Sequence, residues 1–199
     1  MILLSNRAML YILIFIVLFF LLIDLTTLFF RGPNFDVVFY NSDVFFDYSE
    51  VATITTVSGL KFKSNKKKDD YLKVYKDTSR QTFEKYFSEV SKEINKNIQV
   101  VDVKYSWKDR EGILEITESV TLKGLVSSKE ENGTKVYTVG MGRIKMNAVG
   151  NANLKLHIPQ GSIVLSVEPT PTVQNGDFLL WSNEDIIFFP EVSFKRSEG

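Results

Sequence analysis

The sequence predicts an α+β protein, in which an N-terminal transmembrane helix precedes a mainly antiparallel β domain with one long amphipathic helix packed on a sheet. Three observations support this class. Residues 8–30 are almost entirely apolar, residues 71–97 contain no Gly or Pro and repeat apolar side chains every three or four positions, and residues 101–199 alternate apolar and polar side chains between turn signals. Periods of 3.6 and 2 residues are typical of helices and of half-buried strands.

The composition excludes several classes of protein. The 199 residues include 24 basic and 24 acidic side chains, no cysteine and a single histidine. Disulfide scaffolds, zinc ribbons and thiol enzymes all need cysteine. A net charge of zero argues against a nucleic-acid partner, and a hydrophobic content of 44% is that of a folded chain. We therefore expect a folded domain with no cofactor and no nucleic-acid partner.

Residues 8–30 predict a membrane span. As a helix, these 23 residues would extend about 34 Å, enough to cross a hydrocarbon core of about 30 Å. Asp24 lies toward the end of the run, where a charge costs less than at the centre. A cleaved signal peptide is the alternative, but the residues from Asp24 to Phe30 offer no small-residue cleavage site. An uncleaved signal-anchor is the favoured interpretation.

The orientation of this anchor follows from its flanks. Arg7 and Arg31 stand on either side, so the positive-inside rule is nearly balanced. A short N-terminus followed by a long domain is the usual layout of a protein inserted with its N-terminus inside. We expect residues 1–7 in the cytoplasm, residues 8–30 as a single pass of the cytoplasmic membrane, and residues 31–199 outside as one α+β domain.

The first elements of that domain are two strands and a helix. Residues 36–41 and 51–60 are predicted strands, the second because it is β-branched and free of proline. Asp69 and Asp70 are expected to cap a helix of residues 71–97. An apolar stripe of this kind needs a partner surface, so we expect the helix to dock on the sheet. The stripe runs through Leu72, Tyr75, Ser79, Phe83, Phe87, Val90 and Ile94.

The remainder predicts six or seven short antiparallel strands. Leu114, Ile116, Val120 and Leu122 alternate along one long strand. Turns are predicted wherever Gly, Asn or Pro interrupts the alternation. Their positions are residues 109–112, Asn132-Gly133, Pro159-Gln160-Gly161 and Asn175-Gly176. The apolar face expected to receive the helix comprises Val101, Val103, Tyr105 and Trp107.

One basic cluster is the candidate contact site. It holds five lysines within eight residues, and near a membrane each could contribute about 1 kcal/mol to binding anionic headgroups. An acidic envelope polymer is the other candidate ligand. The simpler interpretation, which we favour, is a solvated loop before the helix. The lysines are Lys61, Lys63, Lys66, Lys67 and Lys68.

Candidate catalytic groups are sparse. His157 lies on a predicted strand, facing away from Leu156, with no Ser or carboxylate motif around it, so an exposed strand residue is favoured over a general base. Glu115 and Glu118 are three apart on a strand and are predicted to point to opposite faces. The acidic pair Glu184-Asp185 lies in a predicted loop, where solvated charge is the ordinary outcome. No catalytic residue and no metal site is predicted.

The second half of the chain resembles a known family in the sequences of its turns and strand ends. The stretches concerned are Val120-Thr121-Leu122-Lys123-Gly124, Asn147-Ala148-Val149-Gly150, Ile158-Pro159-Gln160-Gly161, Ser166-Val167-Glu168-Pro169-Thr170-Pro171-Thr172, Leu180-Trp181 and Phe189-Pro190-Glu191-Val192. With the anchor and the single long helix, they resemble a family of small membrane-anchored envelope proteins of thermophilic bacteria and archaea, catalogued only as a domain of unknown function. The resemblance covers about residues 36–199. It implies an anchored α+β domain and assigns no catalytic residue.

These observations favour a non-enzymatic binding or assembly module outside the cytoplasmic membrane, with a protein of the envelope as a candidate partner. Two alternatives remain. One is an envelope hydrolase that uses scattered carboxylates, which a cleft with converging acids would favour. The other is an accessory subunit of a membrane complex, recruited through the anchor with Asp24 facing its partner.

Overall fold

Eleven strands, one long helix and one 3-10 turn make up the described part of the chain. The structure is a computed structural model that describes residues 35–146 and 150–197, apart from the side chains of residues 76–79. Phe35–Gly199 forms one compact unit. In chain order the elements are β1 (Phe35–Phe46), β2 (Val51–Phe62), α2 (Asn65–Glu93), β3 (Gln99–Arg110), β4 (Ile113–Lys123), β5 (Val126–Glu131), β6 (Thr134–Val139), β7 (Asn151–His157), β8 (Ser162–Glu168), β9 (Val173–Gln174), β10 (Phe178–Ser182), η1 (Asn183–Asp185) and β11 (Glu191–Arg196).

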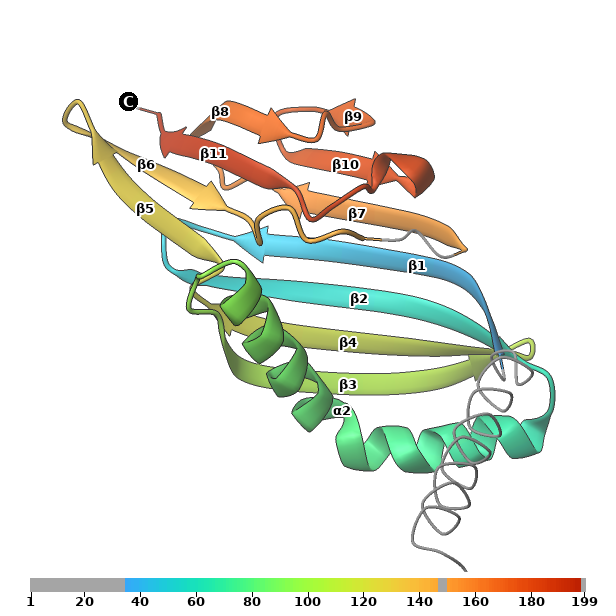
Figure 1. The fold of residues 1–199 in the computed structure, drawn as a ribbon. Helices are drawn as coiled ribbons and strands as arrows, with labels where there is room; N and C mark the ends of the chain where they lie inside the picture. Colours follow the sequence, from blue (N-terminus) through green and yellow to red (C-terminus); the bar gives the residue numbers. More distant parts are fainter. Residues whose placement is uncertain (1–34, 147–149, 198–199) are drawn as a thin grey trace, which may run out of the picture. The chain divides into compact units, whose positions relative to one another are not determined.

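The strands form two sheets, and α2 lies over the β3–β4–β2 side of the larger one (Figure 1). The seven-stranded sheet has the order β3-β4-β2-β1-β7-β10-β9, and the four-stranded sheet has the order β5-β6-β11-β8. The α+β class and the mainly antiparallel character are confirmed. The central pair β1–β7 is parallel, however, and nine strands rather than six or seven follow the helix.

The long helix begins earlier than predicted. Ser64 is its N-cap, in an extended conformation, and the Ser64 hydroxyl accepts a hydrogen bond from the backbone N–H of Lys67 at 3.4 Å. Asp69 and Asp70 therefore lie inside α2, and the expectation that they cap it is wrong. A serine hydroxyl can accept a hydrogen bond from a free N–H at the helix start as well as an aspartate can, and the helix begins at the earlier of the two candidate caps. Figure 1 shows that α2 changes direction partway along its length.

Strand β3 contains a bulge, so its apolar face differs from the predicted one. The pairing of β3 with β4 shifts between Val100 and Asp102, so Val101 is the extra residue. Val101 is 53% exposed, whereas Val100 and Val103 pack against the core. A one-residue bulge reverses the side-chain alternation of a strand. The apolar face expected for Val101 and Val103 together therefore does not exist.

The predicted tight turns are confirmed where hairpins need positive φ. Glu111 and Gly112 join β3 to β4, and Asn132 and Gly133 join β5 to β6, each pair with φ between 50° and 82°. Two successive positive φ angles give the turn whose twist matches a two-residue hairpin. Local sequence therefore determines these connections.

The core consists of two hydrophobic clusters against one face of the larger sheet, which we call the inner face. The larger cluster joins the C-terminal half of α2, through Phe87 and Val90, to both sheets and contains the fully buried Trp181 and Phe194. The smaller cluster is formed by Leu60, Leu114 and Ile116, against which Tyr71, Leu72 and Tyr75 of α2 pack. The predicted docking of the helical stripe on the sheet is confirmed for Leu72, Tyr75, Phe87 and Val90.

The predicted anchor, residues 8–30, lies outside the described residues. Within residues 35–146 and 150–197, no helix is both long and apolar enough to cross a membrane.

Candidate functional site

A cavity of about 160 Å³ lies between α2 and the inner face of the larger sheet, and we call it the α2 cavity. Its floor is formed by β1, β2, β4 and β7, and its roof by the second half of α2. A third wall comes from residues 141–146 and 187–189, which are tied together by backbone hydrogen bonds such as Met146 N–H to Ile187 O at 3.0 Å. The lining residues are Tyr40, Ser42, Ile54, Thr56, Phe83, Tyr86, Phe87, Glu118, Val120, Met141, Met146, Leu154 and Phe189.

A row of polar side chains crosses the floor of this cavity. Strand pairing places Glu118 beside Thr56 and Thr56 beside Ser42, all on the inner face. The Ser42 and Thr56 hydroxyls share a hydrogen bond of 2.8 Å, and both residues are buried. Each hydroxyl therefore has one hydrogen-bond partner, which is the usual condition for burying polar groups. The row separates the two hydrophobic clusters, and the cavity lies where apolar packing is interrupted.

Glu118 is the ionisable group of the floor. The hydroxyl of Tyr75 on α2 donates a hydrogen bond of 2.5 Å to Glu118 Oε1. Burial raises the pKa of the Glu118 carboxyl, and the hydrogen bond from Tyr75 acts in the opposite direction. Burial and the neighbouring carboxylate likewise raise the pKa of Tyr75. Glu118 forms no ion pair with any described side chain.

Aromatic rings line the same cavity as this carboxyl group. Phe83, Phe87 and Phe189 line the interior of the cavity, with Phe87 and Phe189 buried. Tyr40 and Tyr86 are partly exposed at 38% and 46%, so they stand at its open side. Burial is the main reason why the pKa of Tyr86 is raised.

The cavity has the dimensions of a site for a small molecule. An engineered apolar protein cavity of about 150 Å³ binds benzene or xenon, so a single-ring or similarly compact group fits here. Apolar walls with a few placed polar groups are typical of ligand sites. Glu118 is the only carboxylate among the described lining residues, and no group of three or more acidic or histidine side chains in the described ranges could hold a metal ion.

The structure places the predicted lysine cluster away from the α2 cavity. Lys61 lies next to the last residue of β2, and Lys63 connects β2 to α2. The other three, Lys66, Lys67 and Lys68, lie in the first turn of α2. The segment is therefore not the loop that we favoured, because most of these lysines belong to β2 or α2. Four of the five side chains are nevertheless exposed. Lys68 forms an ion pair with Asp109 of β3.

The other predicted acidic groups lie apart. Glu115 is on the outer face of the sheet, paired with Lys108 at 2.9 Å, so its separation from the inward Glu118 is confirmed. Asp185 belongs to η1 and accepts a hydrogen bond of 2.6 Å from the Thr172 hydroxyl. These carboxylates do not converge on the cavity.

His157 has a carboxylate partner that the sequence did not reveal. His157 Nε2 lies 2.7 Å from Asp43 Oδ1, and the Phe45 ring stacks on the imidazole with centroids 4.2 Å apart. The parallel pairing of β1 with β7 brings these residues together over 114 positions of sequence. The pair lies on the outer face of the sheet, opposite the α2 cavity.

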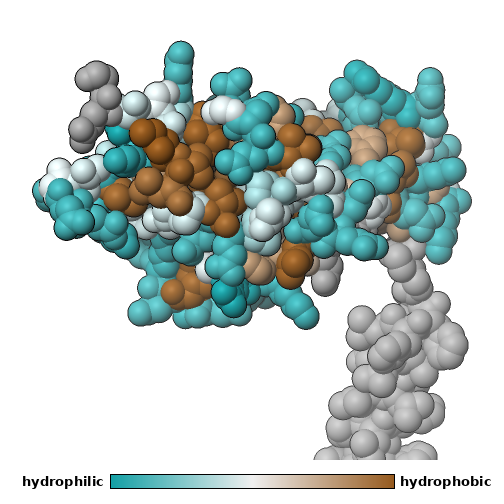
Figure 2. Space-filling model, turned by 90° about the horizontal axis from the view of Figure 1, so that it is seen from above, coloured by the Kyte–Doolittle hydropathy of each residue, from teal (hydrophilic) through white to brown (hydrophobic). Residues whose placement is uncertain are grey.

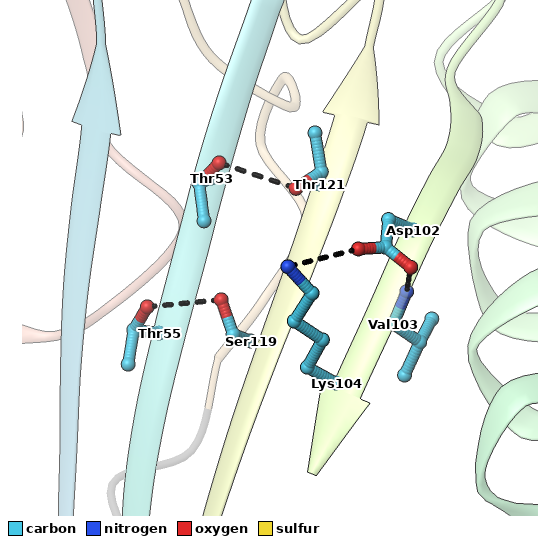
Figure 3. Close-up of polar contacts among 7 residues, drawn as sticks. All are labelled: Thr53, Thr55, Asp102, Val103, Lys104, Ser119 and Thr121. Atoms are coloured by element: carbon cyan, nitrogen blue, oxygen red, sulfur yellow. Dashed lines mark hydrogen bonds and ion pairs between the residues drawn. The ribbon is translucent and has the colours of Figure 1, made fainter.

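The outer face is otherwise a ladder of short polar side chains. Thr53 and Thr55 of β2 each share a hydrogen bond of 3.3 Å with a hydroxyl of β4, and Asp102 of β3 pairs with Lys104 at 3.5 Å (Figure 3). The two hydroxyl pairs join neighbouring strands, and cross-strand pairs of this kind stabilise a solvated sheet face. The seven labelled residues are Thr53, Thr55, Asp102, Val103, Lys104, Ser119 and Thr121.

Exposed apolar side chains occur elsewhere on the surface. Figure 2 shows hydrophobic residues gathered on the face seen from above, where β8 and β9 are uppermost in Figure 1. Ile163 and Leu165 of edge strand β8 are exposed at 45% and 48%. A patch on an edge strand buries less of a small ligand than a cavity does, so the α2 cavity is the candidate functional site.

Fold and site together define a β-rich domain with an apolar cavity between a helix and a sheet. The chain belongs to the family described as Domain of unknown function (DUF4897), which matches residues 35–195. This match confirms the resemblance to a family known only as a domain of unknown function.

The fold also resembles a solved structure. The NMR structure of the folded domain of the Mycobacterium tuberculosis LppM protein is similar with a TM-score of 0.43 and 10% sequence identity, over 84% of this chain and 94% of that chain. No curated protein matches the chain.

Proposed function

We propose that the chain is a membrane-anchored, extracytoplasmic binding protein without catalytic activity, and that it holds a small ligand in the α2 cavity. The observation that carries this proposal is the cavity itself, an apolar space with one carboxyl group on its floor. A tightly packed domain has few voids larger than a water molecule, so a cavity of this size is a departure that a ligand would explain.

The chemistry of the cavity favours binding over catalysis. Acid–base catalysis of hydrolysis, as on sugars, uses a second carboxylate close to the first. Glu118 has no such neighbour among the described lining residues, and Glu115 lies on the opposite face of the sheet. The Asp43–His157 pair is also on that opposite face, so it does not complete a catalytic set with Glu118.

The proposed location rests on the N-terminal sequence. Residues 8–30 are almost entirely apolar and lack a cleavage site, and the proposed orientation has the N-terminus inside. A single-pass anchor inserted in this orientation would leave the cavity-bearing domain outside the cytoplasmic membrane. There the domain would bind its ligand or a protein partner of the envelope.

Methionine-methyl NMR tests the proposal. The chain has four methionines, of which Met141 and Met146 line the α2 cavity, whereas Met1 and Met9 belong to the N-terminal segment. With the full-length protein in detergent, compact probes such as choline and 3,3-dimethylbutan-1-ol are expected to shift the Met141 and Met146 methyl signals and to leave Met1 and Met9 unchanged.

Two variants control this measurement. Val120→Phe fills the cavity from its floor and should abolish the shifts, whereas Thr121→Phe adds the same ring on the outer face and should preserve them. If neither cavity methionine responds to either probe at saturating concentration, the proposed binding function is wrong.

A further inference from the structure

Resting on the proposed function, we infer that the α2 cavity selects a small organic ammonium ion of the trimethylammonium type, with Glu118 as its counter-ion and aromatic rings as its walls. Three independent features of the cavity carry this inference: the charge on its floor, the rings around it and its size.

The charge argument begins with the contacts of Glu118. Among the described side chains, its carboxyl group receives one hydrogen bond, from Tyr75, and forms no ion pair. Moving a carboxylate out of water is unfavourable unless a cation or several hydrogen-bond donors compensate for the lost hydration. A cation bound in the cavity would provide this compensation. A bound carboxylate would add like charge, so anionic ligands are disfavoured.

The aromatic walls select the type of cation. Five of the lining residues carry aromatic rings, and the faces of such rings attract cations through their quadrupole. Clusters of aromatic rings are the usual protein recognition device for quaternary ammonium groups. The rings are Tyr40, Phe83, Tyr86, Phe87 and Phe189.

Size and hydration exclude other cations. A metal ion or a primary ammonium needs several hydrogen-bonding or oxygen ligands to replace its water. The Ser42 and Thr56 hydroxyls are already bonded to each other, and the other walls are largely apolar. A quaternary ammonium needs no hydrogen bonds, and its methyl groups suit Met141, Met146 and Leu154. A space of about 160 Å³ accommodates one such group.

Choline and 3,3-dimethylbutan-1-ol form the matched pair that tests the inference, because they differ only in the charged nitrogen. Calorimetric titration of the full-length protein in detergent is expected to show choline binding about tenfold more tightly or better, from cation–π and ionic attraction. Glu118→Gln should lose most of this preference. Glu115→Gln, the same substitution on the outer face of β4, should retain it.

The outcomes separate the inference from the proposed function. Equal binding of the two probes, abolished by Val120→Phe, would overturn the ammonium inference and leave the binding function standing. Binding of neither probe would overturn both. Dihexanoylphosphatidylcholine below its micelle concentration distinguishes the source of the ammonium group. Tighter binding than choline supports a lipid headgroup, and weaker binding supports a free small molecule.

Discussion

At the scale of single residues, Glu118 shows which features of the site the sequence pattern can predict and which it cannot. Leu114, Ile116, Val120 and Leu122 alternate along β4 and are all buried, and Glu118 occupies the middle position of the same series. Period-two alternation therefore predicts that this carboxylate points inward. Its partners could not be predicted, because Tyr75 lies 43 positions away on another element.

The raised pKa of Glu118 predicts a pH dependence of stability. Because the folded state holds the proton more tightly than the unfolded state, the free energy of unfolding falls as pH rises above the ordinary glutamate value of about 4.3 toward the raised folded pKa. Glu118→Gln cannot ionise, so this loss should disappear. We expect thermal melts of the variant to exceed wild type at neutral pH and to converge with it near pH 4.

Glu115→Gln is the control, since Glu115 pairs with Lys108 on the outer face. If Glu118→Gln and wild type show parallel melting temperatures from pH 4 to 7, the carboxyl group of Glu118 does not bear the cost of burial described above.

At the scale of elements, the existence and the apolar stripe of α2 were predicted, but both of its ends lie earlier than predicted, at Asn65 and Glu93 rather than at residues 71 and 97. Two acidic residues at 69–70 look like a cap, yet Ser64 caps the helix five residues earlier, and three lysines occupy the first turn. Positive charge there opposes the helix dipole, so local electrostatics argue against the observed start. The ion pair of Lys68 with Asp109 partly compensates, and it depends on a strand that follows in sequence.

Strand β3 was mispredicted for a related reason. Alternation read from sequence assumes an uninterrupted strand, and the bulge at Val101 reverses it. A bulge is specified by how β3 pairs with β4, which local pattern does not contain.

Packing of α2 on the sheet is tested by Phe87→Ala. Phe87 is buried at 4% exposure between the helix and the larger cluster, so truncation should destabilise the domain by about 3–5 kcal/mol through lost transfer energy and a cavity. Thermal melts of residues 35–199, a compact unit of their own, measure this effect.

Glu89→Ala is the matched change on the exposed face of α2 and should stay within about 0.5 kcal/mol of wild type. A Phe87→Ala protein that melts like wild type would mean that α2 does not bury this stripe on the sheet, and the helix would then be free for a partner.

The lysines at the start of α2 make a second prediction at this scale. Lys66 and Lys67 are exposed, and we expect them to be solvated rather than bound to headgroups. Changing both to Gln in residues 35–199 should leave sedimentation with anionic vesicles unchanged. Vesicle binding by wild type that falls with salt, and that the double variant lacks, would instead assign these lysines to the membrane surface.

At the scale of the whole molecule, the sequence predicts the class of fold but not its topology. Turn signals at Gly112 and Gly133 define hairpins, because the information is local. The parallel pairing of β1 with β7, the division into two sheets and the Asp43–His157 contact depend on residues far apart in the chain. The α2 cavity belongs to this second group, since four strands and a helix form it.

The predicted anchor concerns the whole molecule as well. Because residues 24–30 offer no cleavage site, the mature protein should keep residues 1–30. Mass spectrometry of the protein extracted from its native membrane measures its N-terminus directly. An N-terminus beyond Phe30 would replace the anchor with a cleaved signal peptide.

The most direct test of the central claim, that the α2 cavity binds an organic ammonium ion, is a crystal structure of residues 35–199 with arsenocholine. Arsenic replaces nitrogen in this choline analogue and marks its position by anomalous scattering. We predict an anomalous peak inside the cavity, between Glu118 and the ring of Phe87. A peak found only elsewhere on the protein, with the cavity closed by its own side chains, would contradict the account.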